Sequence, residues 1–194
     1  MQRAALGLSV TTGRATVAVL GGTRAAPEMV ARFEIQLSDR WKTESAHPYH
    51  LELGRPRSEG EPARVRGCLA AEAGVRRAIR ALLDEMKELE LAALAAGVVS
   101  AKPVDPARVR GAHARAHAAE RKLYLDAVLA AFGEASVPVS VSVEKRIRAE
   151  AGARLRRRPP QLDAMLKQFV RRVGTPWRAP EKNAALAAWM CLPE

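Results

Sequence analysis

The N-terminal segment, residues 4–20, constrains the fold more than any other part of the chain. Residues 6–10 alternate leucine or valine with small side chains, and residues 15–20 are almost continuously apolar. Two apolar runs joined by the short, glycine-containing connection at 11–14 predict a β-hairpin. A strand with little polar surface on either face belongs in the middle of a sheet that helices cover on both sides. We therefore expect this segment to supply the central strand of an α/β sheet.

The rest of the chain alternates between strand and helix patterns. Residues 28–37 alternate so that odd-numbered and even-numbered side chains face opposite ways, which predicts a third strand near the edge of the sheet. Residues 38–62 are rich in Gly, Pro and mixed charges and predict an irregular insertion or loop. The later patterns predict a helix over 63–88, a strand over 91–100, a helix over 106–132, a strand over 137–143, a partly helical basic stretch over 145–158, and helices over 162–173 and 180–192.

This order of elements predicts the architecture. Three antiparallel-type strands, followed by helix, strand, helix, strand and helices, form the ribonuclease H-like topology. That topology is a mixed five-stranded sheet (βββ-α-β-α-β-α) with helices on both faces. A doubly wound sheet would need a helix between the first strands, and no helix fits between residues 20 and 28. At 194 residues, the chain is expected to form a single ribonuclease H-like domain over 1–194.

The charge balance favours an anionic partner. The net charge of +11 and the pI of about 10.6 suit nucleic acid or an anionic membrane surface, although a solvated surface without a partner is an alternative. No apolar run approaches the ~18 residues that span a bilayer, and no signal-peptide pattern precedes the first strand. Cys68 and Cys191 lack any CxxC spacing, so we expect buried free thiols in a reducing compartment. These features predict a soluble cytoplasmic protein.

The strongest functional signal is a basic segment over 145–182. It holds twelve Lys and Arg residues against three acids and so carries +9 of the net charge. Guanidinium groups suit phosphate oxygens because they form forked hydrogen bonds and release condensed counterions. The candidate nucleic-acid-binding cations are Lys145, Arg146, Arg148, Arg154, Arg156, Arg157, Arg158, Lys167, Arg171, Arg172, Arg178 and Lys182. Trp177 lies among them and either stacks on a base or packs the last loop, and packing is the favoured interpretation.

Two stretches of the chain resemble the RuvC-type Holliday junction resolvases. Residues 6–13 (L-G-L-S-V-T-T-G), followed by A-V-L at 18–20, resemble the opening strands of that family, which read roughly L-G-I-D-P-G and then G-Y-A-V-L. The order of the C-terminal elements, ending in an Ala-rich helix, also agrees. The resemblance covers most of the chain except residues 38–62. It implies a ribonuclease H-like fold, a DNA partner and a homodimer.

The catalytic acids that this resemblance implies are largely missing. RuvC-like nucleases use about four carboxylates to hold two divalent metals ~4 Å apart, which activate water and stabilise the leaving oxygen. The corresponding positions here are Ser9 on the first strand, Ser100 at the end of the fourth strand and, on the last helix, Glu181 with Ala184 or Pro180 with Asn183. At most one carboxylate remains, so we expect a degenerate nuclease site that holds no metal or other cofactor.

The histidines form two pairs in the sequence. His113 and His117 have i, i+4 spacing in a predicted helix, one turn before Glu120, and two histidines at that spacing can share a metal. No Glu follows the first histidine as in H-E-x-x-H, so surface histidines are the favoured interpretation. His47 and His50 lie in the irregular segment, where they either cap a site or belong to a plain loop, and the loop is favoured.

The hydroxyl groups of Ser9, Thr11 and Thr12 also suggest a nucleophile or a phosphate-binding loop. The actin-like ATPases share this fold and place a turn between their first strands against phosphate. Their acidic residue at the position of Ser9 is absent here, and their later phosphate and adenosine loops are not evident. Nucleotide hydrolysis is therefore disfavoured.

The sequence supports three functional hypotheses. The first is a non-catalytic, RuvC-like domain whose basic segment binds the backbone of duplex or branched DNA. The second is a metal-dependent endonuclease or junction resolvase that holds Mg²⁺ or Mn²⁺ with relocated carboxylates, drawn from Glu34, Glu52, Asp105 or Glu181. The third is a structural subunit of a larger complex that uses the basic face for assembly. Salt-sensitive DNA binding would indicate the non-catalytic domain, and metal-dependent cleavage would indicate the endonuclease. Copurification with a protein partner but not DNA would indicate the structural subunit.

Overall fold

The central feature of the computed structural model, which describes residues 1–38 and 46–194, is a mixed five-stranded sheet. The strand order is β3-β2-β1-β4-β5, so the first strand is the middle one, as the sequence predicts. The strands are β1 Gln2–Thr11, β2 Arg14–Gly22, β3 Pro27–Gln36, β4 Leu91–Ser100 and β5 Val139–Val143. β1 pairs antiparallel with β2 and parallel with β4, and β4 pairs parallel with β5. The predicted ribonuclease H-like strand order is confirmed.

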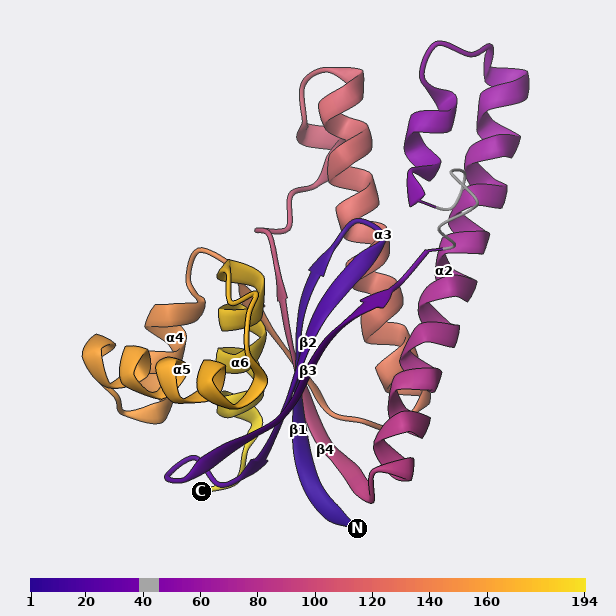
Figure 1. Ribbon diagram of the computed structural model, residues 1–194. Helices are drawn as coiled ribbons and strands as arrows, with labels where there is room; N and C mark the ends of the chain where they lie inside the picture. Colours follow the sequence, from indigo (N-terminus) through magenta and orange to yellow (C-terminus); the bar gives the residue numbers. More distant parts are fainter. Residues whose placement is uncertain (39–45) are drawn as a thin grey trace.

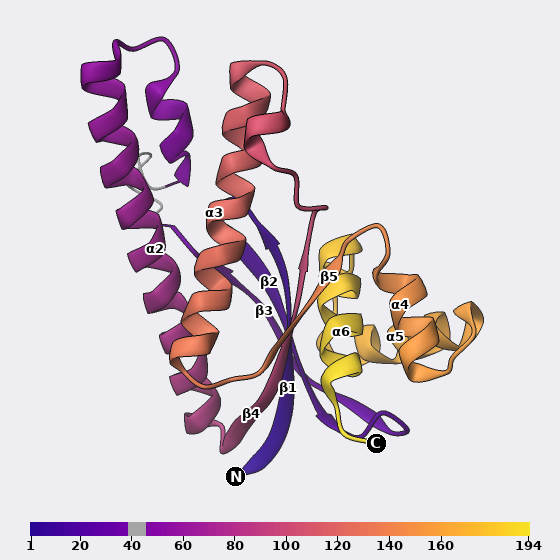
Figure 2. The ribbon, with the colours of Figure 1, turned by 180° about the vertical axis from the view of Figure 1, so that it is seen from behind.

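Helices cover both faces of the sheet (Figures 1 and 2). Two long helices lie on one face, and three shorter helices lie on the other. The elements outside the sheet are η1 Pro48–Glu52, α2 Arg57–Glu88, η2 Pro106–Arg108, α3 Ala112–Glu134, α4 Ile147–Leu155, α5 Pro159–Val173 and α6 Ala179–Cys191. Among the described residues, no helix has the length and apolarity needed to cross a membrane.

Each face of the sheet has its own hydrophobic core. Leu6, Leu8 and their neighbours on β1 pack with α2 and α3, while the alternate residues of the same strand pack with α6. At Gly7, a Cβ atom would overlap the backbone carbonyl oxygen of Ala184, so only glycine allows α6 to lie this close to β1. The helix runs antiparallel to β1 (Figure 1), which places its first turn near the carboxyl end of that strand.

Strand β3 departs from the predicted alternation. Val19 of β2 pairs with Ala31 of β3, but the next residue, Leu20, pairs with Met29. Val30 is therefore an extra residue in β3, which is a β-bulge. Met29 consequently packs with the α6 core, whereas Phe33 packs with the α2–α3 core. The prediction that these two odd-numbered residues share a face is therefore wrong, because one inserted residue reverses the side-chain alternation of a strand.

Two helix starts also differ from the predictions. α2 begins at Arg57 within the stretch predicted to be irregular, and Pro62 lies inside the helix. The first turns of α2 are held against η1, where a Cβ at Gly60 would lie 3.0 Å from the Cα of Glu52. α3 begins six residues later than predicted, because the helical turn that starts at Pro106 ends at Arg108, where Val109 is extended, and Gly111, with a φ of 84°, directly precedes α3. The predicted irregular stretch includes residues 39–45, which lie outside the described residues.

The two cysteines are free thiols, as expected, but they are half-buried rather than buried. Cys68 lies on the part of α2 that approaches Tyr49 rather than on the part that covers the sheet. Cys191 lies at the end of α6, 3.5 Å from the hydroxyl group of Ser140. Partial burial raises the pKa of both thiols, so neither is activated as a thiolate nucleophile.

Candidate nucleic-acid interface

Helix α5 presents part of the basic segment because it is strongly amphipathic. Leu162, Leu166 and Phe169 recur at helical spacing and bury one face against the α6 core. The Arg158 backbone N–H donates to the Gln161 side-chain oxygen at 2.8 Å, which satisfies a free donor at the start of the helix. The opposite face carries exposed cations toward solvent: Lys167, Arg171 and Arg172.

Helix α4 is anchored in the same way. Ile147, Ala151 and Leu155 are buried one turn apart, and the helix ends at Arg156, which adopts a left-handed φ of 52°. This C-terminal residue turns the chain into the short link that carries two further arginines before α5. The exposed cations of α4 and its flanks are Lys145, Arg146, Arg148, Arg154, Arg156 and Arg158, while Arg157 is half-buried.

Most cations of the basic segment have no acidic partner. Arg146 pairs with Glu150 at 3.5 Å, and Arg148 pairs with Asp163 at 2.7 Å. For the other ten Lys and Arg residues of the segment, no ion pair forms within residues 1–38 and 46–194. Arg178 and Lys182 belong to this set and lie at the start of α6. The result is a cationic surface over α4, α5 and the first turn of α6, which we call the basic face.

Trp177 contributes to this face differently from the cations. Its side chain is half-buried and packs against the α6 core. The indole Nε1 is buried and has no hydrogen-bond partner among the described residues. Packing of the last loop, one of the two interpretations of the sequence, accounts for this position.

The positions where RuvC-type enzymes hold carboxylates are only partly brought together. Ser9 is buried near the end of β1 and pairs in register with Val99 of β4, whose side chain packs in the α6 core. Ser100, the residue selected from the sequence, points to the other face and lines a cavity of about 420 Å³ beside α3. Side chains alternate along a strand, so Val99 and not Ser100 is the neighbour of Ser9 on this face.

Glu181 is the one acid at this position, and it already has partners. The residue is 8% exposed, and its Oε2 accepts a hydrogen bond from the Arg178 backbone N–H at 2.7 Å. Its Oε1 lies 3.9 Å from the guanidinium of Arg32 on β3. Asn183, two residues further along α6, is also buried. This carboxylate therefore caps its own helix and pairs with an arginine.

The other acids considered for a relocated nuclease site are scattered. Glu34 pairs with Arg14 at the exposed edge of the sheet, and Glu52 accepts a 2.7 Å hydrogen bond from Arg64. Asp105 accepts from the Ala107 backbone N–H at the start of η2. Within residues 1–38 and 46–194, no group of three metal-ligating side chains includes any of these acids or Glu181.

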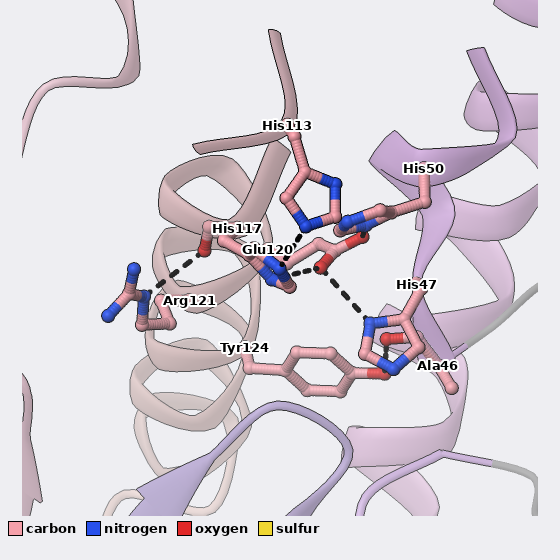
Figure 3. Close-up of polar contacts among 8 residues, drawn as sticks. All are labelled: Ala46, His47, His50, His113, His117, Glu120, Arg121 and Tyr124. Carbon is pink, nitrogen blue, oxygen red and sulfur yellow. Dashed lines mark hydrogen bonds and ion pairs between the residues drawn. The ribbon is translucent and has the colours of Figure 1, made fainter. Parts of the chain in front are cut away.

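A separate cluster of imidazoles lies on the α3 side of the sheet (Figure 3). All four histidines of the chain meet there, two from η1 and the residue preceding it, and two from α3. His50 Nδ1 lies 2.7 Å from Glu120 Oε1, and His47 Nδ1 lies 3.1 Å from Glu120 Oε2. His113 Nε2 and His117 Nε2 are 3.1 Å apart. Burial and the neighbouring His50 and His113 imidazoles lower the pKa of His117.

The spacing of the histidines in the sequence does not predict this cluster. The i, i+4 pair and Glu120 indicate a possible site within one helix, but nothing in the spacing links them to residues some seventy positions earlier. Glu120 is fully buried. A glutamate one turn after two histidines in the same predicted helix is the feature of the sequence that could have indicated the site.

Comparisons with known proteins identify the fold. No family model and no curated protein matches the chain. Among solved structures, the chain resembles the T. thermophilus RuvC in complex with a Holliday junction substrate, with 15% identity, a TM-score of 0.53, and coverage of 98% of this chain and 92% of the RuvC chain. A second Thermus thermophilus RuvC structure matches with 14% identity, a TM-score of 0.51 and the same coverage. The likeness confirms the predicted ribonuclease H-like fold over nearly the whole chain.

Proposed function

We propose that this protein binds the phosphate backbone of duplex or branched DNA through the basic face and does not cleave it at the RuvC-type position. The observation that carries the proposal is a set of ten cations on and around α4, α5 and the start of α6 that form no ion pair within residues 1–38 and 46–194. The solved RuvC complex, which has the same fold and holds a Holliday junction substrate, supports DNA as the ligand.

The physical argument for backbone binding is electrostatic. A cation that is already paired with a carboxylate contributes little to the binding of an anionic ligand. A guanidinium group without such a partner binds phosphate oxygens in a forked geometry. Each phosphate neutralised in this way releases condensed counterions, and this release favours binding at low salt. The cations of the basic segment are spread along α4, α5 and the link between them, so they suit the extended phosphate backbone of a nucleic acid rather than a single small anion.

The argument against two-metal cleavage rests on the ligands. Two divalent ions need several carboxylates around one point. At the RuvC-type position the chain offers Ser9, Val99 and Glu181, and the carboxylate of Glu181 already caps α6 and faces Arg32. A serine, a valine and one engaged carboxylate supply too few oxygen ligands to hold two ions.

Binding to a labelled four-way junction, a matched duplex and a single strand, over a salt series, tests the proposal. The first variant replaces Arg156, Arg157 and Arg158 with Ala. The expected result is weaker binding and a slope of log affinity against log salt that is shallower by about 2–3, at ~0.9 for each lost phosphate contact.

A charge-matched variant controls for the loss of three positive charges. Arg76, Arg77 and Arg80 are exposed on α2, which covers the opposite face of the sheet. Replacing these three with Ala removes the same charge and is expected to leave most of the affinity and the salt slope unchanged. An equal loss in both variants would contradict a localised basic face and would indicate only a general effect of net charge.

The same assay with Mg²⁺ or Mn²⁺ separates the alternatives. Metal-dependent cleavage would overturn the non-catalytic proposal and favour an endonuclease with carboxylates drawn from elsewhere in the chain. Failure to bind any of the three nucleic acids at physiological salt would overturn DNA binding and favour a structural subunit whose basic face contacts a protein. Sedimentation of the free protein tests the homodimer that the resemblance to RuvC predicts.

A further inference from the structure

We propose that His50, His113 and His117 form a binding site for a divalent transition-metal ion of the Zn²⁺ type, with Glu120 as the residue that positions the imidazoles. The site is independent of the proposed DNA-binding function, because it lies on η1 and α3 rather than on α4 and α5 (Figures 1 and 3). It is also distinct from the RuvC-type position, since none of its residues belongs to β1, β4 or α6.

The first argument is the convergence of a rare residue type. The chain contains four histidines, and their rings come together in the structure although they belong to two segments far apart in sequence. The ring centroid of His50 lies 4.9 Å from that of His113 and 4.5 Å from that of His117. One ligand atom from each of these three residues lies within 4.8 Å of the other two. Three imidazoles around one point are a ligand set that zinc sites use.

The second argument is the spacing of the ring nitrogens. His113 Nε2 and His117 Nε2 are 3.1 Å apart. Two nitrogens bound to one tetrahedral ion at ~2.0–2.1 Å lie about 3.3 Å from each other. The observed separation is close to that value, so a small opening of the pair admits an ion. Without an ion, the same distance fits a hydrogen bond from one Nε2 to the other.

The third argument concerns Glu120. Its side chain is fully buried, and its ion-pair partners among the described residues are all histidines, with no Lys or Arg within range. A buried carboxylate is costly unless it is hydrogen-bonded or paired, and the imidazoles supply those partners here. Glu120 Oε1 holds His50 through Nδ1 at 2.7 Å, which directs the other ring nitrogen of His50 away from the carboxylate. A carboxylate that orients a metal-binding histidine in this way is common in zinc sites.

A second ligand set shares His50 and can be distinguished from the first. His47, His50 and Glu120 also lie within reach of one another. In that set, however, both oxygens of the buried Glu120 side chain already contact histidine Nδ1 atoms. In the three-imidazole set, the Nε2 atoms of His113 and His117 contact each other rather than Glu120, which approaches His117 through Nδ1, and both imidazoles are exposed or half-exposed. We therefore assign the first set.

Titration of the full chain with Zn²⁺ and with Co²⁺ tests this assignment, using protein purified without a histidine tag. Isothermal calorimetry measures affinity, and the visible d–d absorption of Co²⁺ reports the ligand geometry. Tight 1:1 binding with a tetrahedral Co²⁺ spectrum is the expected result. A hundredfold excess of Zn²⁺ over its Kd should also raise the Tm by about 5–10 °C. Absence of binding by both ions would overturn the proposal.

Variants identify the ligands. Loss of a residue that only orients a ligand weakens metal binding by about 10–100-fold, so Glu120→Gln should weaken Zn²⁺ binding by that amount. Loss of a ligand itself costs more, so His113→Ala and His117→Ala should each weaken Zn²⁺ binding by about 100-fold or more. His47→Ala is the matched control and should change the affinity by less than about tenfold. His113→Gln and His117→Gln repeat the test with polar side chains of similar length. Affinity lost in His47→Ala but kept in His113→Ala and His117→Ala would overturn the assigned set.

Discussion

At the scale of single residues, small side chains decide how α6 meets the sheet. A Cβ at Gly7 would overlap the Ala184 carbonyl, and a Cβ at Gly97 would lie 2.6 Å from the carbonyl oxygen of Ala187. Such distances do not occur between ordinary Cβ atoms and backbone, so a side chain at either position would push the helix away from β1 and β4. Close packing of this kind uses alanine in place of large apolar residues, which fits the 4% aromatic content of the chain.

Gly7→Ala is predicted to destabilise the protein strongly. The added methyl group meets rigid backbone rather than a flexible side chain, so the free energy of unfolding should fall by about 3 kcal/mol. Urea denaturation followed by circular dichroism measures this change. Gly133→Ala in α3 is the control, since, among the described residues, no heavy atom beyond its chain neighbours and its own helical backbone lies within 4 Å of its Cβ position. That control should be neutral or more stable by about 0.5–1 kcal/mol, and equal stability of both variants would contradict the packing argument.

At the scale of elements, α5 joins the basic face to the core. Its buried residues Leu162, Leu166 and Phe169 contact the α6 core, and the Phe169 ring meets Trp189 edge-to-face at a centroid distance of 6.0 Å. The cations on its outer face are consequently held on a rigid element. Surface charges on a fixed helix keep their spacing, which favours repeated contact with a regular phosphate backbone.

Phe169→Ala is predicted to lower the free energy of unfolding by about 3–5 kcal/mol, because it leaves a cavity between α5 and α6. Urea denaturation measures the loss. Gln168→Ala, at the neighbouring exposed position, should change stability by no more than about 0.5 kcal/mol. If Phe169→Ala were as stable as the wild type, α5 would not be anchored in the way that the packing indicates.

At the scale of the whole molecule, the sheet separates two surfaces of different chemistry. Helices α4, α5 and α6, which carry the basic face, lie on one side of the sheet, whereas α3 and η1, which carry the histidine cluster, lie on the other (Figures 1 and 2). The basic face and the histidine cluster share no residue: the four histidines all lie outside the basic segment. The two proposals therefore depend on different residues and can fail separately.

The two surfaces are predicted to bind their ligands independently. Sites that share no residues and lie on different elements couple weakly, so saturating Zn²⁺ should change four-way junction affinity by less than about twofold. In return, the Arg156, Arg157 and Arg158 triple-alanine variant should bind Zn²⁺ with wild-type affinity. Calorimetry and the junction assay measure the two effects. A reciprocal change in both affinities would show coupling through the sheet.

The sequence by itself determined the architecture of this protein. The apolar run over residues 4–20 predicted the central hairpin, and the succession of strand and helix patterns predicted the ribonuclease H-like sheet, because alternation and helical spacing are local properties of the chain. The concentration of cations over residues 145–182 is also a local property of the sequence. Most of these cations are exposed in the structure, as expected for a basic segment that faces solvent.

Only the tertiary structure decided which distant residues share a site. The bulge in β3 reversed the face of Met29, and the register of β1 with β4 made Val99 rather than Ser100 the neighbour of Ser9. The packing of η1 against α3 brought His50 to Glu120 across seventy positions of sequence. Each of these outcomes depends on how separate elements are aligned and packed, and a pattern within one element carries no information about that alignment.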